Sequence, residues 1–594
     1  MDQGLTSSLS VTGKHWHLAN GNDRLIEALS QKYNLPEILC RLLVNRGVTL
    51  ETAATYLKPN LRDLLPNPSI LLDMDKAIER MVKALENNEK IAVYGDYDVD
   101  GACASALLRK YFSLINYPIA LYIPDRIEEG YGANSQALEA LYKQGITVVL
   151  MVDCGTNAFD PLKHAKNLGL DVIVLDHHTA ESKLPLCTAL VNPNRLDQDL
   201  GSFPSLKNLC AAGVSYLFLI ALQRALRFNQ WFKTFNLEEP NLLLFLDLVA
   251  LATVCDVMPL TNLNRSFVSQ GLKILRQRQN LGLKTLADVA GLSEAPTAYH
   301  LGFILGPRIN AGGRVGKAHM GSRLLTSIHP TEALELANDL HTLNQQRQDI
   351  EKQVFEQALE EIEIQKLYKN PVLLIGNETW HPGIIGIVAS RLKDQFNRPV
   401  CVVSFENNIG KGSGRSVKGA CLGTAMHVAV QKGLLEKGGG HTMAAGFTVH
   451  KDKYMEFHNF LNDYLGNQLL DYIPALELDG YVSLRSLTPQ FLTSIQQFEP
   501  YGLGNPTPRF AIRNLQIDHL DTLNNLHLKC IVKDQEKYRL KAMAFRAKNK
   551  SLGNFLEENY HSKKLIEIAG TLHLSFWNGC QQISIFIEDA KYCF

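Results

Sequence analysis

The sequence predicts an α/β protein with a parallel-sheet domain, a long connecting helix, a smaller α/β domain and a C-terminal β-barrel. Three patterns support this expectation. From residue 51, short apolar runs alternate with helical spacing, which is typical of a doubly wound parallel sheet. Residues 335–368 form one long polar helical pattern. Beyond residue 458, short alternating strands follow one another closely, which indicates a small barrel.

The parts of the chain are expected at defined boundaries. The prediction places a helical segment at 1–50, the parallel-sheet domain at 51–334, the connecting helix at 335–368, the smaller domain at 369–458 and the barrel at 459–594. A length of 594 residues fits this division at roughly 150 residues per domain. Hydrophobic residues make up 46% and charged residues 20%, an ordinary globular composition.

Charge and cysteine content narrow the class of protein. Lys and Arg number 60, as do Asp and Glu, so any nucleic-acid groove must rely on local positive charge. The 11 cysteines have no C-x-x-C spacing, which indicates reduced thiols in the cytoplasm rather than disulfides or a zinc site. The polar N-terminus lacks a signal core, and the longest apolar stretch, 241–260, is interrupted by Asp247 and Asp256. No membrane span is expected.

Functional side chains follow the apolar strands of the first domain. The expected strands are 91–98, 119–124, 146–155, 171–178 and 188–194, with helices at 102–115 and from Ser135. Acids and histidines fall at the strand ends: Asp96, Asp98, Asp100, Asp153, Asp176, His177 and His178. In open parallel sheets, ligands bind beyond the carboxyl ends of the strands. The sequence therefore predicts one shared site at this edge of the sheet.

The composition of this site predicts divalent metal ions. Asp96, Asp98 and Asp100 repel one another unless cations neutralise them, and Gly101 permits a tight turn after them. Taken alone, this segment is equally well a solvated acidic turn or a calcium loop. The DHH triplet at 176–178, together with Asp153 and Asp256, favours the metal site. Oxygen ligands suit Mg²⁺ or Mn²⁺, and imidazole shifts the preference toward Mn²⁺.

Two such ions about 3.5–4 Å apart activate a water and stabilise the leaving oxygen of a phosphoryl displacement. The metal site alone leaves the substrate open between a polynucleotide phosphodiester, pyrophosphate and a cyclic dinucleotide.

Four motifs resemble those of the DHH phosphoesterase superfamily, in the same order: VYGDYDVDGACASALL, VDCG, VLDHHTA and ATVCDVMPL. GKGSGRSVKG (410–419) and KGGGHTMAAGFTV (437–449) resemble the accessory DHHA1 domain. LGPRINAGGRVG (305–316) and EPYGLGNPTPRF (499–510) resemble segments of the bacterial RecJ exonuclease family. The resemblance covers residues 60 to 594. It implies a DHH domain, a DHHA1 domain and an OB-fold barrel in a 5′-to-3′ exonuclease that degrades single-stranded DNA during recombination and repair.

The resemblance also implies roles for individual residues. Two Mn²⁺ or Mg²⁺ ions would be held by Asp98, Asp100, Asp153, His177 and Asp256, with Asp153 as the bridging ligand. His178 would contact the scissile phosphate and completes the expected catalytic set. The pyrophosphatase branch of the superfamily has a metal-binding histidine where this chain has Tyr94, which weakens the pyrophosphatase interpretation. We expect Asp96 to substitute for that histidine as a metal ligand.

Basic and glycine-rich motifs are the candidates for binding a polynucleotide. Glycines let backbone N–H groups approach a phosphate and arginine supplies a fork for two oxygens, although a surface turn or a turn into a packed helix would look the same. The resemblance assigns the 5′-terminal phosphate and backbone to Arg126, Arg308, Ser413 and Arg415. Further expected contacts are Arg314, Lys418, His441 and Trp577. In the barrel, Phe545, Arg546 and Phe576 are either base-stacking groups or core.

The sequence leaves two rival functions. The first is a phosphodiesterase for oligonucleotides or cyclic dinucleotides, which in this superfamily typically consists of the two catalytic lobes alone. The second is a nucleic-acid-binding scaffold, which would have lost the metal ligands that this chain keeps. The barrel and long helix favour the exonuclease. The resemblance further suggests a monomer, with single-stranded DNA-binding protein and a RecQ-type helicase as partners.

Overall fold

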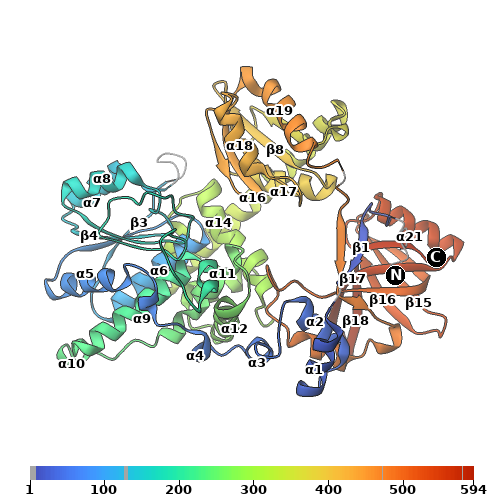
Figure 1. Ribbon diagram of the computed structural model, residues 1–594, viewed down its shortest axis with the longest axis horizontal. Coiled ribbons are helices and arrows are strands. Elements are labelled where there is room, and N and C mark those ends of the chain that lie inside the picture. The colour runs from blue at the N-terminus through green and yellow to red at the C-terminus, as the bar shows by residue number, and fades with distance from the viewer. Residues whose placement is uncertain (1–8, 20, 126–131, 471, 578–579, 594) are drawn as a thin grey trace.

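The computed structural model describes residues 9–19, 21–125, 132–470, 472–577 and 580–593. It consists of a first lobe (68–326), a long helix, a second lobe (373–466) and a barrel (480–592), which are separate bodies in Figure 1. The predicted α/β class with a C-terminal barrel is confirmed.

The first lobe contains a five-stranded sheet in the order β3-β2-β4-β5-β6, and all its pairings are parallel. Its strands are β2 (Ile91–Tyr94), β3 (Ala120–Tyr122), β4 (Val148–Val152), β5 (Asp171–Leu175) and β6 (Ala189–Val191). Val148 and Leu150 pack into one core, whereas Val149 and Met151 pack into another. This alternation shows that both faces of the sheet are covered, as the continuous apolar runs predicted.

Helices cover the two faces of this sheet. One face carries α7 (Ser135–Lys143) and α8 (Phe159–Leu168), and the other carries α5 (Met74–Glu86), α6 (Val99–Leu114) and α9 (Ala211–Phe228). The lobe is completed by α11 (Leu246–Cys255), α12 (Asn262–Arg276), α13 (Leu281–Val289), the π-helix η4 (His300–Leu305), α14 (Gly306–Val315) and α15 (Met320–Thr326). The carboxyl ends of the strands remain free to form a site.

Helix α9 is long and apolar enough to cross a membrane by length and composition, although the sequence predicts no membrane span. However, 72% of its apolar window is buried inside the first lobe, where it packs against α5, α6 and α11. Its apolar sequence is therefore explained by its place in the core.

The connecting helix α16 (Pro330–Ile364) is longer at its start than the predicted 335–368 and leads into the second lobe. The second-lobe sheet has the order β10-β11-β9-β8-β7. Its strands are β7 (Leu373–Asn377), β8 (Val400–Glu406), β9 (Ile409–Arg415), β10 (Lys437–Gly440) and β11 (Ala444–His450), flanked by α17 (Ile385–Phe396), α18 (Leu422–Gln431) and α19 (Tyr454–Gly466). Only β7 and β8 pair in parallel, so the sheet is mixed.

The barrel closes because β14 pairs with both β15 and β17. The strands around the ring are β14 (Arg509–Leu523), β15 (His527–Lys533), β16 (Arg539–Ala544), β18 (Cys580–Tyr592) and β17 (Ile566–Trp577), with β13 (Gly480–Tyr481) added to β14. Helix α21 (Ser551–Ser562) packs on the barrel core. The expectation of a small barrel is therefore confirmed.

The N-terminal segment belongs spatially to the barrel, which the sequence did not predict. Strand β1 (His15–Leu18) pairs in parallel with β12 (Ala475–Leu478). Helices α1 (Asp23–Tyr33) and α2 (Glu37–Asn45) share a core with Phe498 and Phe510. Short helices α3 (Ala53–Leu57) and α4 (Leu61–Leu64) lead from there to the first lobe (Figure 1).

The glycine-rich motifs are regular structure rather than loops. GKGSGRSVKG lies mostly in β9, and the three glycines of KGGGH lie in β10. A Cβ on Gly412 would lie 2.2 Å from the Phe447 ring, so packing against a side chain requires this glycine. The segment 305–316 forms helix α14, in which Gly313 lies against Tyr97. Packing against a neighbouring ring therefore accounts for Gly412 and Gly313, and approach of a phosphate to these motifs stays a prediction.

Candidate metal centre and strand groove

The first acidic motif is held by the turn between β2 and α6. Asp98 is the N-cap of α6, and its Oδ1 accepts hydrogen bonds from the backbone N–H groups of Asp100 (2.9 Å) and Gly101 (3.1 Å). A Cβ on Gly101 would come within 2.5 Å of the Asp96 carbonyl oxygen, so only glycine fits there. Asp96, Asp98 and Asp153 bring ligand oxygens within 4.8 Å of one another.

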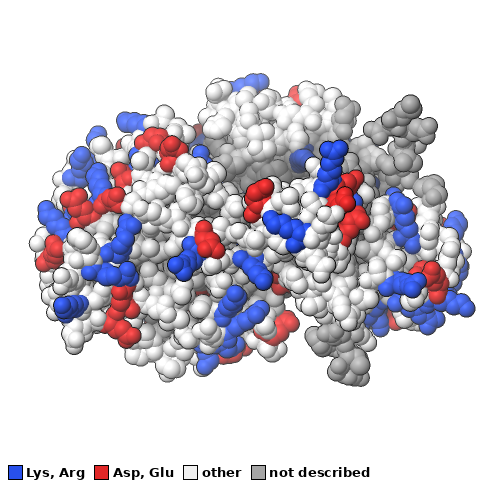
Figure 2. Space-filling view, turned by 60° about the horizontal axis from the view of Figure 1, so that its bottom comes forward, with Lys and Arg blue, Asp and Glu red and all other residues white. Residues whose placement is uncertain are grey.

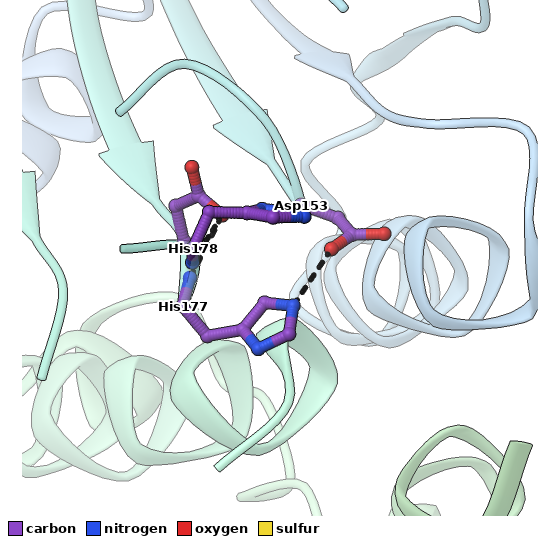
Figure 3. A group of neighbouring side chains, drawn as sticks. Asp153, His177 and His178 are labelled. Atoms are coloured by element: carbon purple, nitrogen blue, oxygen red, sulfur yellow. Dashed lines mark hydrogen bonds and ion pairs between the residues drawn. The ribbon is translucent and has the colours of Figure 1, made fainter. Parts of the chain in front are cut away.

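His177 is the meeting point of the other acids. Its Nε2 lies 3.3 Å from Asp153 Oδ1, 3.6 Å from Asp256 Oδ2 and 3.7 Å from Asp100 Oδ2. Figure 3 shows the His177 ring turned toward Asp153 across the ends of neighbouring strands. Asp153 directly follows β4 and adopts φ +61°, a left-handed conformation that a non-glycine residue rarely takes. Residues from four separate segments thus converge, as the strand-end pattern predicted.

Asp100 is bound by a helix that the sequence analysis did not connect with the site. Its two carboxylate oxygens accept the backbone N–H groups of Ala211 (2.6 Å) and Ala212 (2.8 Å), at the start of α9. The positive end of the helix dipole lies there and stabilises a carboxylate. Asp100 nevertheless keeps an oxygen in a cluster with His177 and Asp256, within 4.8 Å.

Asp176 orients His178, and its carboxylate also lies in a group with Asp153 and His177 whose ligand atoms are within 4.8 Å of one another. Its Oδ1 lies 2.7 Å from His178 Nδ1, and its Oδ2 accepts the Thr156 N–H. Burial opposes the positive charge, but the hydrogen bond and charge of Asp176 raise the pKa of His178 to about 9. Burial would likewise raise the pKa of Asp176, yet the hydrogen bond and charge of His178 hold that pKa below its ordinary value. The two groups form an ion pair whose imidazolium is partly exposed.

Polar residues after β6 complete the support of the DHH turn. The Asn192 side chain donates to the His178 carbonyl (2.8 Å), and the Asn194 side chain donates to the His177 carbonyl (2.6 Å). From α14, Asn310 Oδ1 accepts the N–H of Val99, beside the Asp98 cap. The sequence analysis missed these residues, although two asparagines directly after an apolar strand, in VNPN, were a signal.

The donor set fits divalent cations. Burial, followed by the charges of neighbouring aspartates, raises the pKa values of Asp153 and Asp256. Within the described chain, Asp256 Oδ2 is buried and accepts no hydrogen bond. Crowded buried carboxylates are stabilised by a bound cation, and oxygen with one imidazole suits Mn²⁺ or Mg²⁺.

Tyr94 is a core residue rather than part of the centre. It is fully buried, and its hydroxyl donates to the Gly132 carbonyl at 3.2 Å. Its ring stacks on Tyr122. The Tyr94 side chain, at the position where the pyrophosphatase branch has a metal-binding histidine, therefore packs in the core of the sheet.

A run of contacts leads from the acidic turn to the second lobe. Arg314, on the same helix as Asn310, donates from Nη1 to the Gly383 carbonyl at 2.9 Å. A Cβ on Gly386 would lie 3.0 Å from Ser413 Oγ and 3.4 Å from Arg415 Nη2. The beginning of α17 thus faces Ser413 and Arg415, and burial lowers the pKa of Arg415.

The remaining predicted DNA contacts are more scattered. Arg308 donates to the Ile304 carbonyl and to His341 Nδ1. Lys418 and His441 are exposed in the second lobe, and the His441 N–H donates to the Ala444 carbonyl. Arg126 and the side chains of Phe576 and Trp577 lie outside the described residues.

A groove of about 1030 Å³ extends between the two lobes and the barrel. Its lining includes five cationic side chains, Arg314, Arg347, Lys352, Arg391 and Arg546, and the apolar side chains of Phe303, Phe355 and Leu526. Asn310 and Arg314 connect it to the acidic turn. On the barrel side, the predicted candidate Phe545 is half-exposed and packs edge-on against Phe586, which stacks with His573.

Comparisons with known proteins agree across the chain. Family models match for the DHH family N-terminal domain (90–253), the DHHA1 domain (366–467) and the RecJ OB domain (478–589). The single-stranded-DNA-specific exonuclease RecJ of Bacillus subtilis is 32% identical over 584 residues, covering 97% of this chain and 70% of that protein. The RecJ of Escherichia coli is 35% identical over 489 residues, covering 80% and 83%.

Solved structures give the same result. The crystal structure of RecJ from Thermus thermophilus in complex with Mn²⁺ has a TM-score of 0.80 and 26% identity, covering 98% of this chain and 80% of that chain. The Mg²⁺ complex of the same protein has a TM-score of 0.73. By sequence identity, domain content and fold, this chain belongs to the RecJ family of metal-dependent, single-stranded-DNA-specific exonucleases.

Proposed function

We propose that the chain removes mononucleotides from the 5′ end of single-stranded DNA by two-metal hydrolysis, in DNA recombination and repair. The observation that carries the proposal is the convergence of buried aspartates from separate segments on His177 and Asp153. Burying several carboxylates together carries a large free-energy cost unless bound cations neutralise their charge.

Two neighbouring groups would hold the ions. Asp96, Asp98 and Asp153 form an all-oxygen group, and Asp100, His177 and Asp256 form a second group. Asp153 would bridge them, because it belongs to the first group and lies 3.3 Å from His177 of the second. When bound, the pair of ions supplies an activated water and charge stabilisation for an in-line displacement.

The protein's own groups would position the phosphate. Asp176 holds the His178 ring through Nδ1, and the His178 side chain is 42% exposed. The His178 imidazolium, held in this way, would contact the scissile phosphate and stabilise the negative charge that develops on the phosphate oxygens. Asn192 and Asn194 fix the turn that carries both histidines.

A separate anion site would select the 5′ end. The beginning of α17 presents backbone N–H groups beside Ser413 and Arg415, and the arginine fork suits a terminal phosphate. The Arg314–Gly383 contact ties this turn to helix α14, whose Asn310 side chain accepts the Val99 N–H of the acidic turn. A fixed terminal phosphate next to the cleavage site explains removal of one nucleotide at a time. We assign Arg126, Arg308, Lys418 and His441 to neighbouring backbone contacts by family resemblance.

The groove between lobes and barrel favours a polymer over a small substrate. Its cationic side chains would follow the backbone while the aromatic rings of Phe303 and Phe545 stack on bases. We assign the same role to Trp577, whose side chain lies outside the described residues. A phosphodiesterase for a dinucleotide would not require a groove that reaches the barrel. Figure 2 shows positive and negative side chains interspersed over the face in view, in keeping with local rather than global positive charge.

The proposal also covers the cellular setting, which we place in the cytoplasm. The ten described free cysteines suit a reducing cytoplasm. A monomer, and partnership with single-stranded DNA-binding protein and a RecQ-type helicase, follow from family resemblance.

The test is a time course with 5′-labelled and 3′-labelled single strands and a matching blunt duplex, with Mn²⁺, Mg²⁺ or EDTA. We expect early release of the 5′ label as mononucleotide, only with metal and only from the single strand. Early loss of the 3′ label would overturn the polarity. Hydrolysis restricted to dinucleotides or cyclic dinucleotides would move the chain to the small-substrate branch.

A further inference from the structure

The barrel domain reaches the metal centre through the loop 499–506. The Leu503 carbonyl accepts the N–H of Leu260 at 2.7 Å, and Gly502 and Gly504 lie against Leu260 and Pro259. These contacts fall four residues or fewer after Asp256. A loop of the C-terminal part therefore rests on the segment that carries one of the candidate ligands.

Asp256 depends on its own backbone segment more than Asp98 and Asp100 do. Asp98 and Asp100 accept backbone N–H bonds that fix their oxygens. Among the described residues, no hydrogen bond reaches Asp256 Oδ2. Asp256 ends helix α11, and Val257 follows in a left-handed conformation at φ +56°, which is costly for a β-branched residue. The carboxylate position is therefore set by this backbone. It is held by α11, where the Met258 N–H donates to the Thr253 carbonyl at 3.0 Å, and by the contacts of the following residues with the loop.

Arg265 fastens the loop to the first lobe. Its side chain is almost completely buried, with 1% exposure, on helix α12. The guanidinium donates to the carbonyls of Tyr56 (3.1 Å) and Glu499 (2.9 Å) and lies 4.2 Å from the Tyr56 ring. A buried cation whose hydrogen bonds go to carbonyls from two other segments is costly to keep, and its geometry depends on all three segments being in place.

Asn505 closes the loop on the N-terminal segment. Its side-chain N–H groups donate to the carbonyls of Phe498 and Pro500 at 2.7 and 2.8 Å. Its oxygen accepts from Arg46 Nε (2.8 Å) and from the Tyr56 hydroxyl (2.7 Å). The N-terminal segment, the barrel loop and helix α12 thus form one buried polar joint, and the loop also contacts the segment 259–261 that follows Asp256.

We propose that Arg265 and the loop 499–506 form a latch that positions Asp256, so that docking of the barrel helps to build the metal site. Arg265 is a positioning residue in this scheme, because it acts on the Asp256 segment through the loop. The inference rests on the proposed role of Asp256 as a metal ligand. Displacement of the latch would make the Asp256 backbone more mobile and would lower the affinity for the ion that Asp256 and His177 are proposed to hold.

The test measures Mn²⁺ binding to the full chain directly, by titration with the electron paramagnetic resonance signal of free Mn²⁺. Arg265→Lys removes the fork that spans Tyr56 and Glu499. Gly504→Ala adds a Cβ 3.2 Å from Thr261 and 3.3 Å from Pro259 at φ +74°, and so disturbs the loop with the arginine intact. Arg398→Lys is the matched control, since Arg398 also donates to carbonyls, of Tyr368 and Asn370, in a different part of the chain.

In both latch variants, the dissociation constant of the more weakly bound Mn²⁺ ion should rise about 10-fold, as is typical when a group that supports a metal ligand is lost. Arg398→Lys should bind Mn²⁺ like the wild type even where its melting temperature falls. Suppose that the wild type binds Mn²⁺ and that Asp256→Asn removes this binding. Unchanged Mn²⁺ affinity in Gly504→Ala, or in Arg265→Lys that folds, would then overturn the latch but not the metal centre. Wild-type protein without a Mn²⁺ site, or with one that Asp256→Asn leaves intact, would overturn the proposed metal centre as well.

Discussion

At the residue scale, the carboxylates of the centre are fixed in two ways. Asp98, Asp100 and Asp176 accept backbone N–H groups, so their oxygens have defined positions before any ion binds. Asp153 and Asp256 depend instead on backbone geometry, with left-handed conformations at Asp153 and at Val257. Strain of this kind is retained where the surroundings enforce it and function requires it.

Asp176 offers a test of orientation without loss of a proposed ligand. Asp176→Asn keeps the shape of the side chain but removes the charge that holds His178. We expect single-turnover cleavage to slow about 10- to 100-fold, because a supporting group is lost, while Mn²⁺ binding changes little. Asp197→Asn, which removes the exposed carboxylate partner of the buried Arg195, is the control and should retain the wild-type rate. An Asp176→Asn enzyme of wild-type rate would remove the orienting role.

Asp247 makes the stability of the first lobe depend on pH. Burial raises the pKa of Asp247 to about 6, although the Leu248 N–H and the charge of Lys110 act in the opposite direction. Because the folded pKa lies above the unfolded value, ionisation favours unfolding. The cost is absent below about pH 4 and complete above pH 6. Asp247→Asn should therefore add up to about 3 kcal/mol of stability at pH 7.5 and nothing at pH 4.

Urea denaturation at both pH values measures this difference. A gain that is the same at pH 4 would show that the effect comes from packing instead of charge.

At the element scale, the sequence predicted those features that depend on local pattern. Apolar runs that end on acids located β2, β4 and β5 and brought Asp153 and His177 to one edge. Three kinds of feature depended on partners far away in sequence and were missed. These are the capture of Asp100 by α9, the pairing of β1 with β12, and the strand conformation of the glycine motifs. A glycine in a strand and one in a loop look alike until the neighbouring side chain is known.

Gly412 and Gly446 test this explanation on neighbouring strands. A Cβ on Gly412 would meet the Phe447 ring at 2.2 Å, whereas a Cβ on Gly446 would meet nothing within 4 Å. Gly412→Ala should lower the free energy of unfolding by about 1–3 kcal/mol through overpacking. Gly446→Ala should leave it unchanged or raise it slightly. Equal effects of the two substitutions in urea denaturation would show that Phe447 does not require the glycine.

At the scale of the whole molecule, the active surface is assembled from parts that are distant in the chain. The candidate metal centre lies in the first lobe and the proposed anion site in the second, and the groove between the lobes reaches the barrel residues Leu526 and Arg546. Helix α16 spans the distance between the lobes, and Arg347 and Arg391 meet on its Glu351. A single strand would contact all three bodies at once, so its affinity reports on their arrangement.

Salt dependence of binding measures how many phosphates the groove neutralises. For a single strand, the logarithm of the binding constant should fall with the logarithm of salt concentration by about 0.7 for each neutralised phosphate. Arg546→Gln removes one groove cation and should reduce that slope by about 0.7. Arg539→Gln removes a barrel arginine that is paired with Asp518, and it should leave the slope as it is. Equal slopes in both variants and the wild type would place the strand away from this side of the barrel. A reduced slope in Arg546→Gln alone would locate the strand between the barrel and the two lobes. In that arrangement the 5′ end lies at the metal centre and the 3′ part of the strand extends through the groove past the barrel.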